Sequence, residues 1–177
     1  MGSIVITEIN SIFSEKDFTF IKNKFENSYF EDNKTWEGGI KEFSKPVKIH
    51  RIKDDNLIQL INNSIKKIDI SPLNKNVIDG CIFHKWESGC YIPWHNDTKY
   101  SAGLTIYLND DWSYRNGGLF LYKEDNNIKA IIPQRNKGVL QIGGVPHSTT
   151  IISKNSKPRK TLQIFFKKFN MLKNSLI

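Results

Sequence analysis

The sequence predicts a mainly β protein with two N-terminal helices that pack against a double-stranded β-helix (jelly-roll) barrel. From Val77 onward, short apolar runs alternate with turn signals, and about eight strands without helical periodicity between them are typical of a sandwich or jelly roll. Two segments of helical periodicity precede them. At 177 residues we expect one domain, 1–177, with helical support over about 1–76 and a jelly-roll core over about 77–170.

The N-terminal elements are predicted from periodicity and capping. Residues 4–9 alternate apolar and polar side chains, which indicates an opening strand. Ser14 is a suitable N-cap for a helix that runs to about Asn27 with its apolar side chains on one face. A second amphipathic helix is expected over about 54–68, and residues 28–46 between the two helices are expected to be a loop.

Turn signals divide the β part into its strands. Asn116-Gly117-Gly118 and Asn136-Lys137-Gly138 are the strongest of them, because Asn and Gly accept the positive φ angles that tight turns need. The apolar runs Gly103–Leu108 and Arg159–Phe169 have the composition of strands that pack in the core.

Composition restricts the class of protein. Hydrophobic residues make up 38% of the chain and aromatic residues 12%, which indicates a globular core. No apolar run is long enough to cross a membrane and the N-terminus lacks a signal-peptide pattern, so we expect a cytoplasmic protein without membrane contact. In that reducing compartment Cys81 and Cys90 are expected to be free thiols that serve packing.

The net charge of +8 is unevenly distributed along the chain. Residues 1–80 hold twelve basic and twelve acidic side chains, whereas residues 151–177 hold seven basic and no acidic ones. Such a cluster can bind nucleic acid or another polyanion. The alternative, which we favour, is a solvated basic strand and tail. The sequence does not indicate an oligomeric state.

A candidate metal site begins with His95-Asn96-Asp97. In an extended strand the side chains of His95 and Asp97 project on the same side. With His147, fifty residues later, they supply two imidazoles and one carboxylate, the ligand set of the facial triad that holds Fe(II) and leaves coordination positions open. A surface turn is the alternative for this segment, because Asn-Asp is also turn chemistry.

Two further residues are candidates for binding a carboxylate. Arg159 follows the turn that ends at Pro158, and a hairpin there would bring it near the strand of His147. Its planar guanidinium suits a bidentate grip on a carboxylate. Tyr107 lies in a core-like strand, where a buried hydroxyl must find a polar partner. The alternatives are an exposed strand arginine and a core tyrosine bonded to the backbone.

In their order along the chain, these residues resemble a known family. The stretch from about Cys81 to Phe166 is similar to the Fe(II)- and 2-oxoglutarate-dependent dioxygenases, in particular to their prolyl-4-hydroxylase-like branch. The motifs that carry the resemblance are Trp86-Glu87-Ser88-Gly89, His95-Asn96-Asp97, Tyr107-Leu108-Asn109-Asp110-Asp111-Trp112, Gly117-Gly118-Leu119-Phe120-Leu121, Val145-Pro146-His147 and Arg159-Lys160-Thr161-Leu162.

The resemblance implies a role for each site residue. His95, Asp97 and His147 would be the catalytic iron ligands, and Arg159 and Tyr107 would hold the distal carboxylate of 2-oxoglutarate. It also implies Fe(II) and O2, with ascorbate as a candidate reductant. The reaction would hydroxylate an unactivated C–H bond and release succinate and CO2. Asp97 favours hydroxylation over halogenation, for which the resemblance would imply a small residue at this position.

The sequence departs from the family at two positions. Arg159 follows His147 by twelve residues, slightly more than the family spacing, and Lys157 at ten residues is a rival anchor for 2-oxoglutarate. We prefer Arg159 because Arg-x-Thr-Leu matches the following strand of the family. In addition, Trp86 stands where many prolyl hydroxylases carry tyrosine, which puts in doubt a contact from this position to the proximal carboxylate.

The substrate remains open at the level of sequence. The resemblance favours a prolyl or other residue of a peptide or protein, or an amino-acid-like small molecule. One alternative is a non-enzymatic jelly-roll sensor or binding module that retains metal. A nucleic-acid oxidative demethylase ranks lowest, because the final strand reads RKTLQIFF and lacks that group's arginine and asparagine pattern. Loops at 28–46 and 109–116 are expected to select the substrate.

Overall fold

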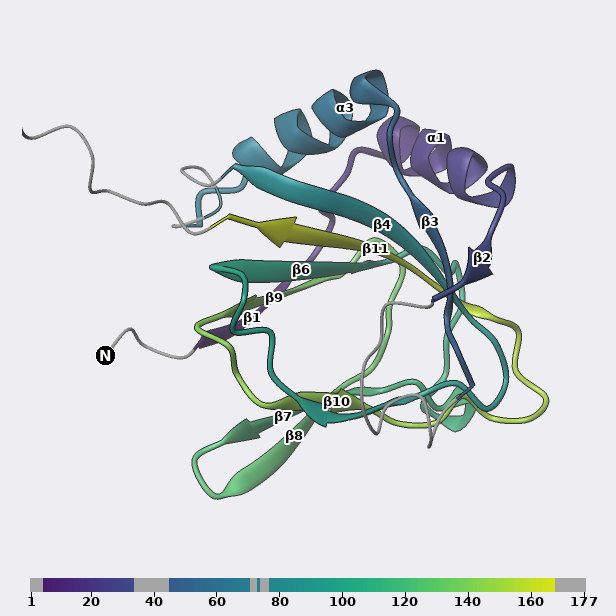
Figure 1. Cartoon of the computed structure of the whole chain (residues 1–177), viewed down its shortest axis with the longest axis vertical. Helices are drawn as coiled ribbons and strands as arrows, with labels where there is room; N and C mark the ends of the chain where they lie inside the picture. Colours follow the sequence, from purple (N-terminus) through teal and green to yellow (C-terminus); the bar gives the residue numbers. More distant parts are fainter. Residues whose placement is uncertain (1–4, 34–44, 71–72, 74–76, 168–177) are drawn as a thin grey trace, which may run out of the picture.

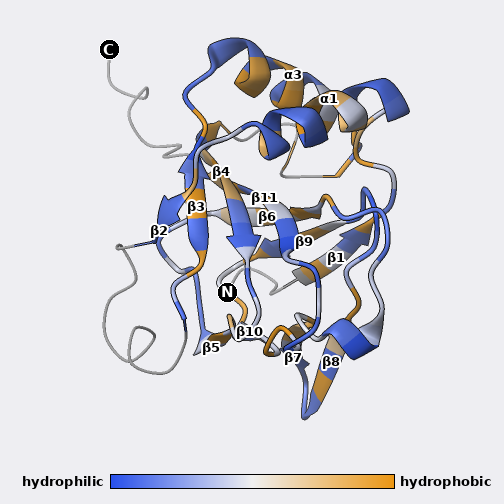
Figure 2. Cartoon of the chain, turned by 90° about the vertical axis from the view of Figure 1, so that its right-hand side faces the viewer, coloured by the Kyte–Doolittle hydropathy of each residue, from blue (hydrophilic) through white to orange (hydrophobic). Residues whose placement is uncertain are grey.

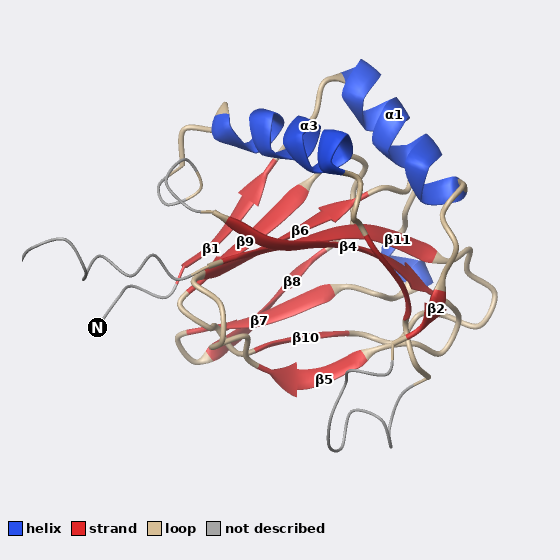
Figure 3. Ribbon diagram, turned by 45° about the horizontal axis from the view of Figure 1, so that its top comes forward, coloured by secondary structure: helices blue, strands red, loops and turns tan. Residues whose placement is uncertain are grey.

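The computed structural model describes residues 5–33, 45–70, 73 and 77–167, and all structural statements below concern these residues. Two antiparallel sheets face each other, and two helices cover the outer side of the larger sheet (Figure 1). Figure 3 shows the three layers from above, with the smaller sheet on the side away from the helices. None of the helices described is long and apolar enough to cross a membrane.

The larger sheet has seven strands. In spatial order they are β1 (Val5–Ile9), β9 (Gly138–Ile142), β6 (Ala102–Tyr107), β11 (Arg159–Phe166), β4 (Ile78–Trp86), β3 (Lys48–Arg51) and β2 (Glu31–Asp32). Strand β11 lies at the centre of this sheet, and its pairings with β4 and β6 are the longest in it.

The smaller sheet has four strands. In spatial order they are β5 (Ile92–His95), β10 (His147–Thr149), β7 (Phe120–Glu124) and β8 (Asn127–Ile131). A short 3-10 helix, η1 (Tyr114–Asn116), lies in the connection from β6 to β7, which crosses from one sheet to the other. Gly117 and Gly118 follow it with φ angles of 69° and 63°, a conformation that favours glycine.

Both helices begin where their caps predict. Ser14 Oγ accepts a hydrogen bond from the backbone N–H of Asp17 at 3.1 Å, and α1 runs over Glu15–Glu26. Asp54 Oδ1 accepts from the backbone N–H of Leu57 at 3.2 Å, and α3 runs over Asp55–Lys66.

Each helix turns one apolar stripe to the larger sheet, as the colouring of Figure 2 shows. The buried residues are Phe18, Ile21 and Phe25 of α1 and Leu57, Ile61 and Ile65 of α3. Burying a side chain of this size contributes about 1.5–3 kcal/mol.

The central strand of the larger sheet, β11, is largely buried on both faces, and the two faces differ in chemistry. On β11, Leu162, Ile164 and Phe166 pack in the core under the helices. Arg159 and Gln163, at alternate positions, face the interior between the sheets. The outer face therefore holds the helices, while the inner face is free to carry polar side chains.

The prediction of a mainly β protein with two helices and about eight strands after residue 77 is confirmed, since β4 to β11 are eight strands. Cys81 and Cys90 are free and buried, as expected. The closed barrel is not observed, because hydrogen bonds join the described strands into two separate sheets. A barrel requires pairing around its whole circumference, and the smaller sheet has only four strands of three to five residues.

Two smaller differences concern the N-terminal half of the chain. Strands β2 and β3 were not predicted, because their apolar alternation is too short to detect, and β1, β2 and β3 place part of residues 1–76 in the larger sheet. The predicted 28–46 loop contains β2 at Glu31–Asp32, and its residues 34–44 lie outside the described residues.

Candidate iron and cosubstrate site

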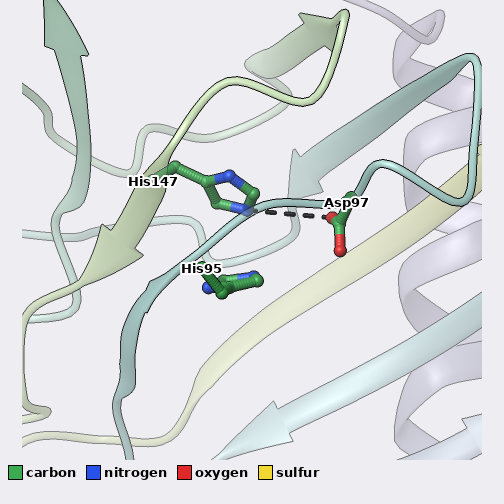
Figure 4. A group of neighbouring side chains, drawn as sticks. All are labelled: His95, Asp97 and His147. Atoms are coloured by element: carbon green, nitrogen blue, oxygen red, sulfur yellow. Dashed lines mark ion pairs between the residues drawn. The ribbon is translucent and has the colours of Figure 1, made fainter.

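Two histidines meet because two short strands of the smaller sheet pair in one register. His95 ends β5 and His147 begins β10, and the two residues lie directly opposite each other. Their ring centroids are 4.2 Å apart. The ligand atoms of His95, Asp97 and His147 all lie within 4.8 Å of one another, and Figure 4 shows the three side chains converging.

The same local contact orients both imidazoles. His95 Nδ1 lies 2.9 Å from the carbonyl oxygen of Pro93, and His147 Nδ1 lies 2.8 Å from that of Val145. A carbonyl oxygen can only accept, so each Nδ1 carries the proton and donates it. The lone pair of each ring is therefore on Nε2, the atom that a metal would bind.

Asp97 lies two residues beyond the end of β5, in a turn closed by its own carbonyl and the backbone N–H of Tyr100. The expectation that His95 and Asp97 share one extended strand is therefore wrong for Asp97. Its Oδ2 nevertheless lies 3.8 Å from His147 Nε2, drawn as the dashed line in Figure 4. Burial and the neighbouring His95 lower the pKa of His147, so its imidazole is neutral at pH 7.

Neutral imidazole nitrogens and a carboxylate oxygen are the donor set that Fe(II) takes in a facial triad. Since one ligand atom of each of the three residues lies within 4.8 Å of the other two, the residues present fit such an ion.

The three candidate ligands open into a cavity of about 110 Å³ between the two sheets. The smaller sheet and the loop after β5 contribute the ligands, whereas the larger sheet contributes polar side chains from four of its strands. These are His84 of β4, Thr105 and Tyr107 of β6, Gln141 of β9, and Arg159 and Gln163 of β11.

Arg159 is a fully buried, positively charged side chain that lines this cavity. Its exposed fraction is 2%, and burial lowers its pKa to about 10, so it remains cationic at neutral pH. The guanidinium carbon lies 4.2 Å from the ring centroid of Trp86, and Nη1 donates to the carbonyl of Gly118. No carboxylate among the described residues pairs with it, and Nε has no hydrogen-bond partner there.

A buried cation without a counter-ion is costly. Tyr107 lines the same cavity with an exposed fraction of 1%, and its hydroxyl also lacks a partner among the described residues. Burial raises the pKa of Tyr107 to about 12, so the hydroxyl keeps its proton. Two unsatisfied donors that face one cavity fit an anionic ligand with several acceptor oxygens, such as a carboxylate.

The structure distinguishes Arg159 from its rival Lys157. Lys157 is exposed and does not line the cavity. The expected hairpin between the strands of His147 and Arg159 is wrong, since β10 and β11 belong to different sheets. Arg159 instead approaches the cavity from the face opposite His147, which is why the spacing along the sequence can vary.

Trp86 does not present a polar atom to a ligand. Its Nε1 donates to Thr161 Oγ1 at 3.1 Å, and its ring lies against Arg159. We therefore expect no hydrogen bond from Trp86 to a bound carboxylate. Trp86 supports the arginine rather than the ligand.

Several lining residues were missed by the sequence interpretation. His84 is not among the residues predicted for the site, but it lines the cavity, where burial and nearby Arg159 lower its pKa to about 3. Gln141 and Gln163 received no role. A usable signal exists: polar side chains recur at every second position in strands that are otherwise apolar, as in Arg159, Thr161 and Gln163.

Several aromatic side chains close to the site motifs in the sequence do not line the cavity. Trp94 points outward with an exposed fraction of 42%, and neither Trp112 nor Tyr91 lines the cavity. In the basic C-terminal segment, Lys160 and Lys167 form ion pairs with Glu26 and Asp79. The described part of that segment therefore belongs partly to the solvated surface network.

Comparison with solved structures shows that the fold is that of the 2-oxoglutarate/Fe(II) oxygenases. A prolyl-4-hydroxylase from Pseudomonas putida matches with a TM-score of 0.72 at 14% identity, covering 94% of each chain. A prolyl hydroxylase from Trichoplax adhaerens, in complex with a peptide fragment of the hypoxia inducible factor oxygen degradation domain, matches with 0.71 at 17% identity over 92% of this chain and 83% of that chain.

The fold resemblance expected from the sequence is thereby confirmed, with prolyl hydroxylases among the similar structures. The α-ketoglutarate-dependent epimerase SnoN of nogalamycin biosynthesis also matches, with a TM-score of 0.69 at 9% identity over 92% of this chain and 78% of that chain. No protein-family model and no curated protein sequence matches the chain. The shared fold thus extends over nearly the whole chain, but it accompanies more than one reaction.

Proposed function

We propose that this protein is a Fe(II)- and 2-oxoglutarate-dependent dioxygenase that hydroxylates an unactivated C–H bond. The single observation that carries the proposal is the content of one cavity. An open group of two imidazoles and a carboxylate lies in the same cavity as a buried arginine that has no acidic partner among the described residues. The first group suits Fe(II) and the second suits a carboxylate cosubstrate. We treat the chain as one catalytic domain in a cytoplasmic protein.

In this proposal His95, Asp97 and His147 hold the metal. Arg159 and Tyr107 hold the distal carboxylate of 2-oxoglutarate, because they supply the buried donors that lack partners. When bound, the iron and cosubstrate would supply the oxidation: one oxygen atom of O2 enters the C–H bond, and the other converts 2-oxoglutarate to succinate and CO2.

The chain's own residues prepare this chemistry without taking part in the electron transfer. Pro93 and Val145 carbonyls fix the tautomer of the two imidazoles. Apolar side chains such as Ile92 and Phe120 line the cavity and limit water. Trp86 and the carbonyl of Gly118 hold Arg159 in place.

The substrate we favour is a prolyl or other residue of a peptide or protein, or an amino-acid-like small molecule. Support comes from the prolyl hydroxylases among the similar structures, one of them in complex with a peptide. A metal-retaining binding module is the second candidate, because the fold alone does not require turnover. The ion pairs of Lys160 and Lys167 keep a nucleic-acid demethylase below both.

Anaerobic titration with Fe(II) and then 2-oxoglutarate tests the proposal. The weak visible absorption band of the chelated complex should appear in the wild-type protein and be absent in Asp97→Ala. If no band forms in the wild type, the oxygenase proposal is wrong.

Succinate release under air separates the enzyme from the binding module. We expect succinate to form faster in the presence of a true substrate, tested among peptides, free amino acids and nucleosides. The product mass must rise by one oxygen atom, because uncoupled turnover also gives succinate. A protein that forms the anaerobic complex but yields no succinate with any of these is better explained as a binding module.

A further inference from the structure

Gln141 of β9 contacts one of the proposed metal ligands. Its side chain is 6% exposed and faces the cavity, and its Nε2 donates to Asp97 Oδ2 at 2.9 Å. Among the described residues, this is the one hydrogen bond that the Asp97 carboxylate accepts from a side chain. Asp97 lies in a turn beyond β5 and lacks the regular strand ladder that holds His147.

The second observation is the orientation of the Gln141 amide. Its Oε1 is buried and has no hydrogen-bond partner in the described structure. A carboxylate can only accept, so rotating the amide would turn Oε1 toward Asp97 and break the bond. The Gln141 amide thus donates a hydrogen bond to Asp97 while its own Oε1 stays buried without a donor. A buried unpaired acceptor costs free energy, and an apolar side chain of the same length would not carry that cost.

A third observation explains how Gln141 reaches Asp97. Gly103 on β6 is the direct cross-strand neighbour of Gln141. A Cβ atom at Gly103 would lie 2.8 Å from Gln141 Nε2, closer than van der Waals contact allows. The φ angle of Gly103 is not in the left-handed region, so the backbone itself does not require glycine here. The missing side chain leaves space mainly for the Gln141 amide, since a Cβ atom there would lie farther from Gln163 Nε2, at 3.3 Å.

We infer that Gln141 is a positioning residue that fixes the Asp97 carboxylate for metal binding, and that Gly103 provides the room it needs. This inference rests on the proposed function, in which Asp97 is a metal ligand. Partners that orient a ligand from outside the coordination shell typically change metal affinity by about 10- to 100-fold. The loss of the Gln141 amide should act through affinity for the metal and not through folding.

The chain offers a matched control. Gln163 is also buried in the same cavity, on β11, but it accepts from the Thr105 hydroxyl and does not contact Asp97. Replacing either glutamine with methionine removes one buried amide from the same cavity with little change in volume. Only Gln141→Met removes the bond to Asp97.

The experiment is anaerobic titration of the full chain with Fe(II), and with Co(II) as a spectroscopic substitute. We expect Gln141→Met to weaken metal binding about tenfold or more, and Gln163→Met to stay within about threefold of wild type. Gly103→Ala should weaken binding in the same direction as Gln141→Met, because its Cβ displaces the flexible end of Gln141. Melting temperatures of the metal-free variants establish that each is folded.

Equal metal affinities for Gln141→Met and Gln163→Met would overturn the inference. So would a Gln141→Asn variant that binds metal as tightly as wild type, since its amide is withdrawn by one methylene and cannot reach Asp97. A wild-type protein that binds no metal, or an Asp97→Ala variant that binds it normally, instead contradicts the proposed function. The two failures are therefore distinguishable.

Discussion

The two ends of the cavity are built in different ways. At one end, which we call the iron end after its proposed ligands His95, Asp97 and His147, both histidines come from short strands of the smaller sheet. Each imidazole is oriented by the backbone carbonyl two residues earlier in the chain. Asp97 there keeps 28% of its side chain exposed. At the arginine end, Arg159 is almost fully buried in the larger sheet and held by Trp86 and Gly118, which lie far from it in the sequence.

The difference also concerns how well each end is satisfied by the protein itself. The Nδ1 atoms of both histidines have backbone partners, and the Nε2 atoms, which we assign to the metal, have no hydrogen-bond partner among the described residues. At the other end, Arg159 Nε and the Tyr107 hydroxyl are buried donors without partners in the described chain. The iron end is therefore oriented in advance by local contacts, whereas the arginine end stores an unpaired charge that a ligand would satisfy.

The largest effect is expected when one of the proposed metal-binding side chains is removed, because this should affect the iron end and leave the arginine end unchanged. His147→Ala should lower metal affinity by more than 100-fold, because it deletes a direct ligand rather than a supporting contact. Binding of glutarate, a dicarboxylate without the chelating 2-oxo group, should be unchanged because it depends on Arg159. Calorimetry with each ligand measures both. Parallel loss of metal and glutarate binding would show that the two ends are not independent.

Arg159→Met reverses that pattern. Truncating one partner of a buried charged contact costs about 2–5 kcal/mol, so binding of 2-oxoglutarate should weaken by about 100-fold. Metal binding should be retained. Because the buried guanidinium has no counter-ion in the described chain, the melting temperature of the ligand-free variant should not fall.

Lys157→Ala is the control for this variant. It removes an exposed cation two residues away and should leave the affinity for 2-oxoglutarate unchanged. If Lys157→Ala weakens cosubstrate binding and Arg159→Met does not, the anchor has been assigned to the wrong residue.

A smaller effect is expected when the support of Arg159 is removed. A desolvated cation–π contact contributes about 2 kcal/mol, so Trp86→Leu should weaken 2-oxoglutarate binding by about 30-fold. Trp86→Phe keeps an aromatic face and loses only the hydrogen bond to Thr161, so it should lie between Trp86→Leu and wild type. Identical affinities for the two variants would argue against the stacking contribution.

A further effect concerns stability rather than binding, and its size depends on the pH. Burial lowers the pKa of His84 to about 3, whereas the unfolded chain has the ordinary value near 6.5. Between these values the unfolded state binds a proton that the folded state does not, so stability is complete above pH 6.5 and falls as the pH is lowered. The contribution of His84 is at most about 1.4 kcal/mol per pH unit.

His84→Gln should flatten this acid dependence. Denaturant unfolding of the metal-free protein at several pH values between 6.5 and 4 measures the slope. An unchanged slope in His84→Gln would mean that His84 is not the group responsible.

Much of the fold could be predicted because its signals are local. Ser14 and Asp54 cap their helices through contacts three residues away, and the apolar stripes of both helices follow from their spacing. Strands β2 and β3 were missed because two and four residues carry no detectable alternation. The proposed roles of His95, Asp97, His147, Arg159 and Tyr107 stay predictions, although the structure brings all five to one cavity.

By itself, the sequence determined the residue types available for chemistry: two histidines and an aspartate at the right spacing, and an arginine late in the chain. Only the tertiary structure decided how they meet. His95 faces His147 through strand register, Arg159 enters from the opposite sheet, and Gln141 reaches Asp97 across the space above Gly103. The physical reason is that register and the facing of two sheets bring together side chains far apart in the chain, and no local pattern records those distances.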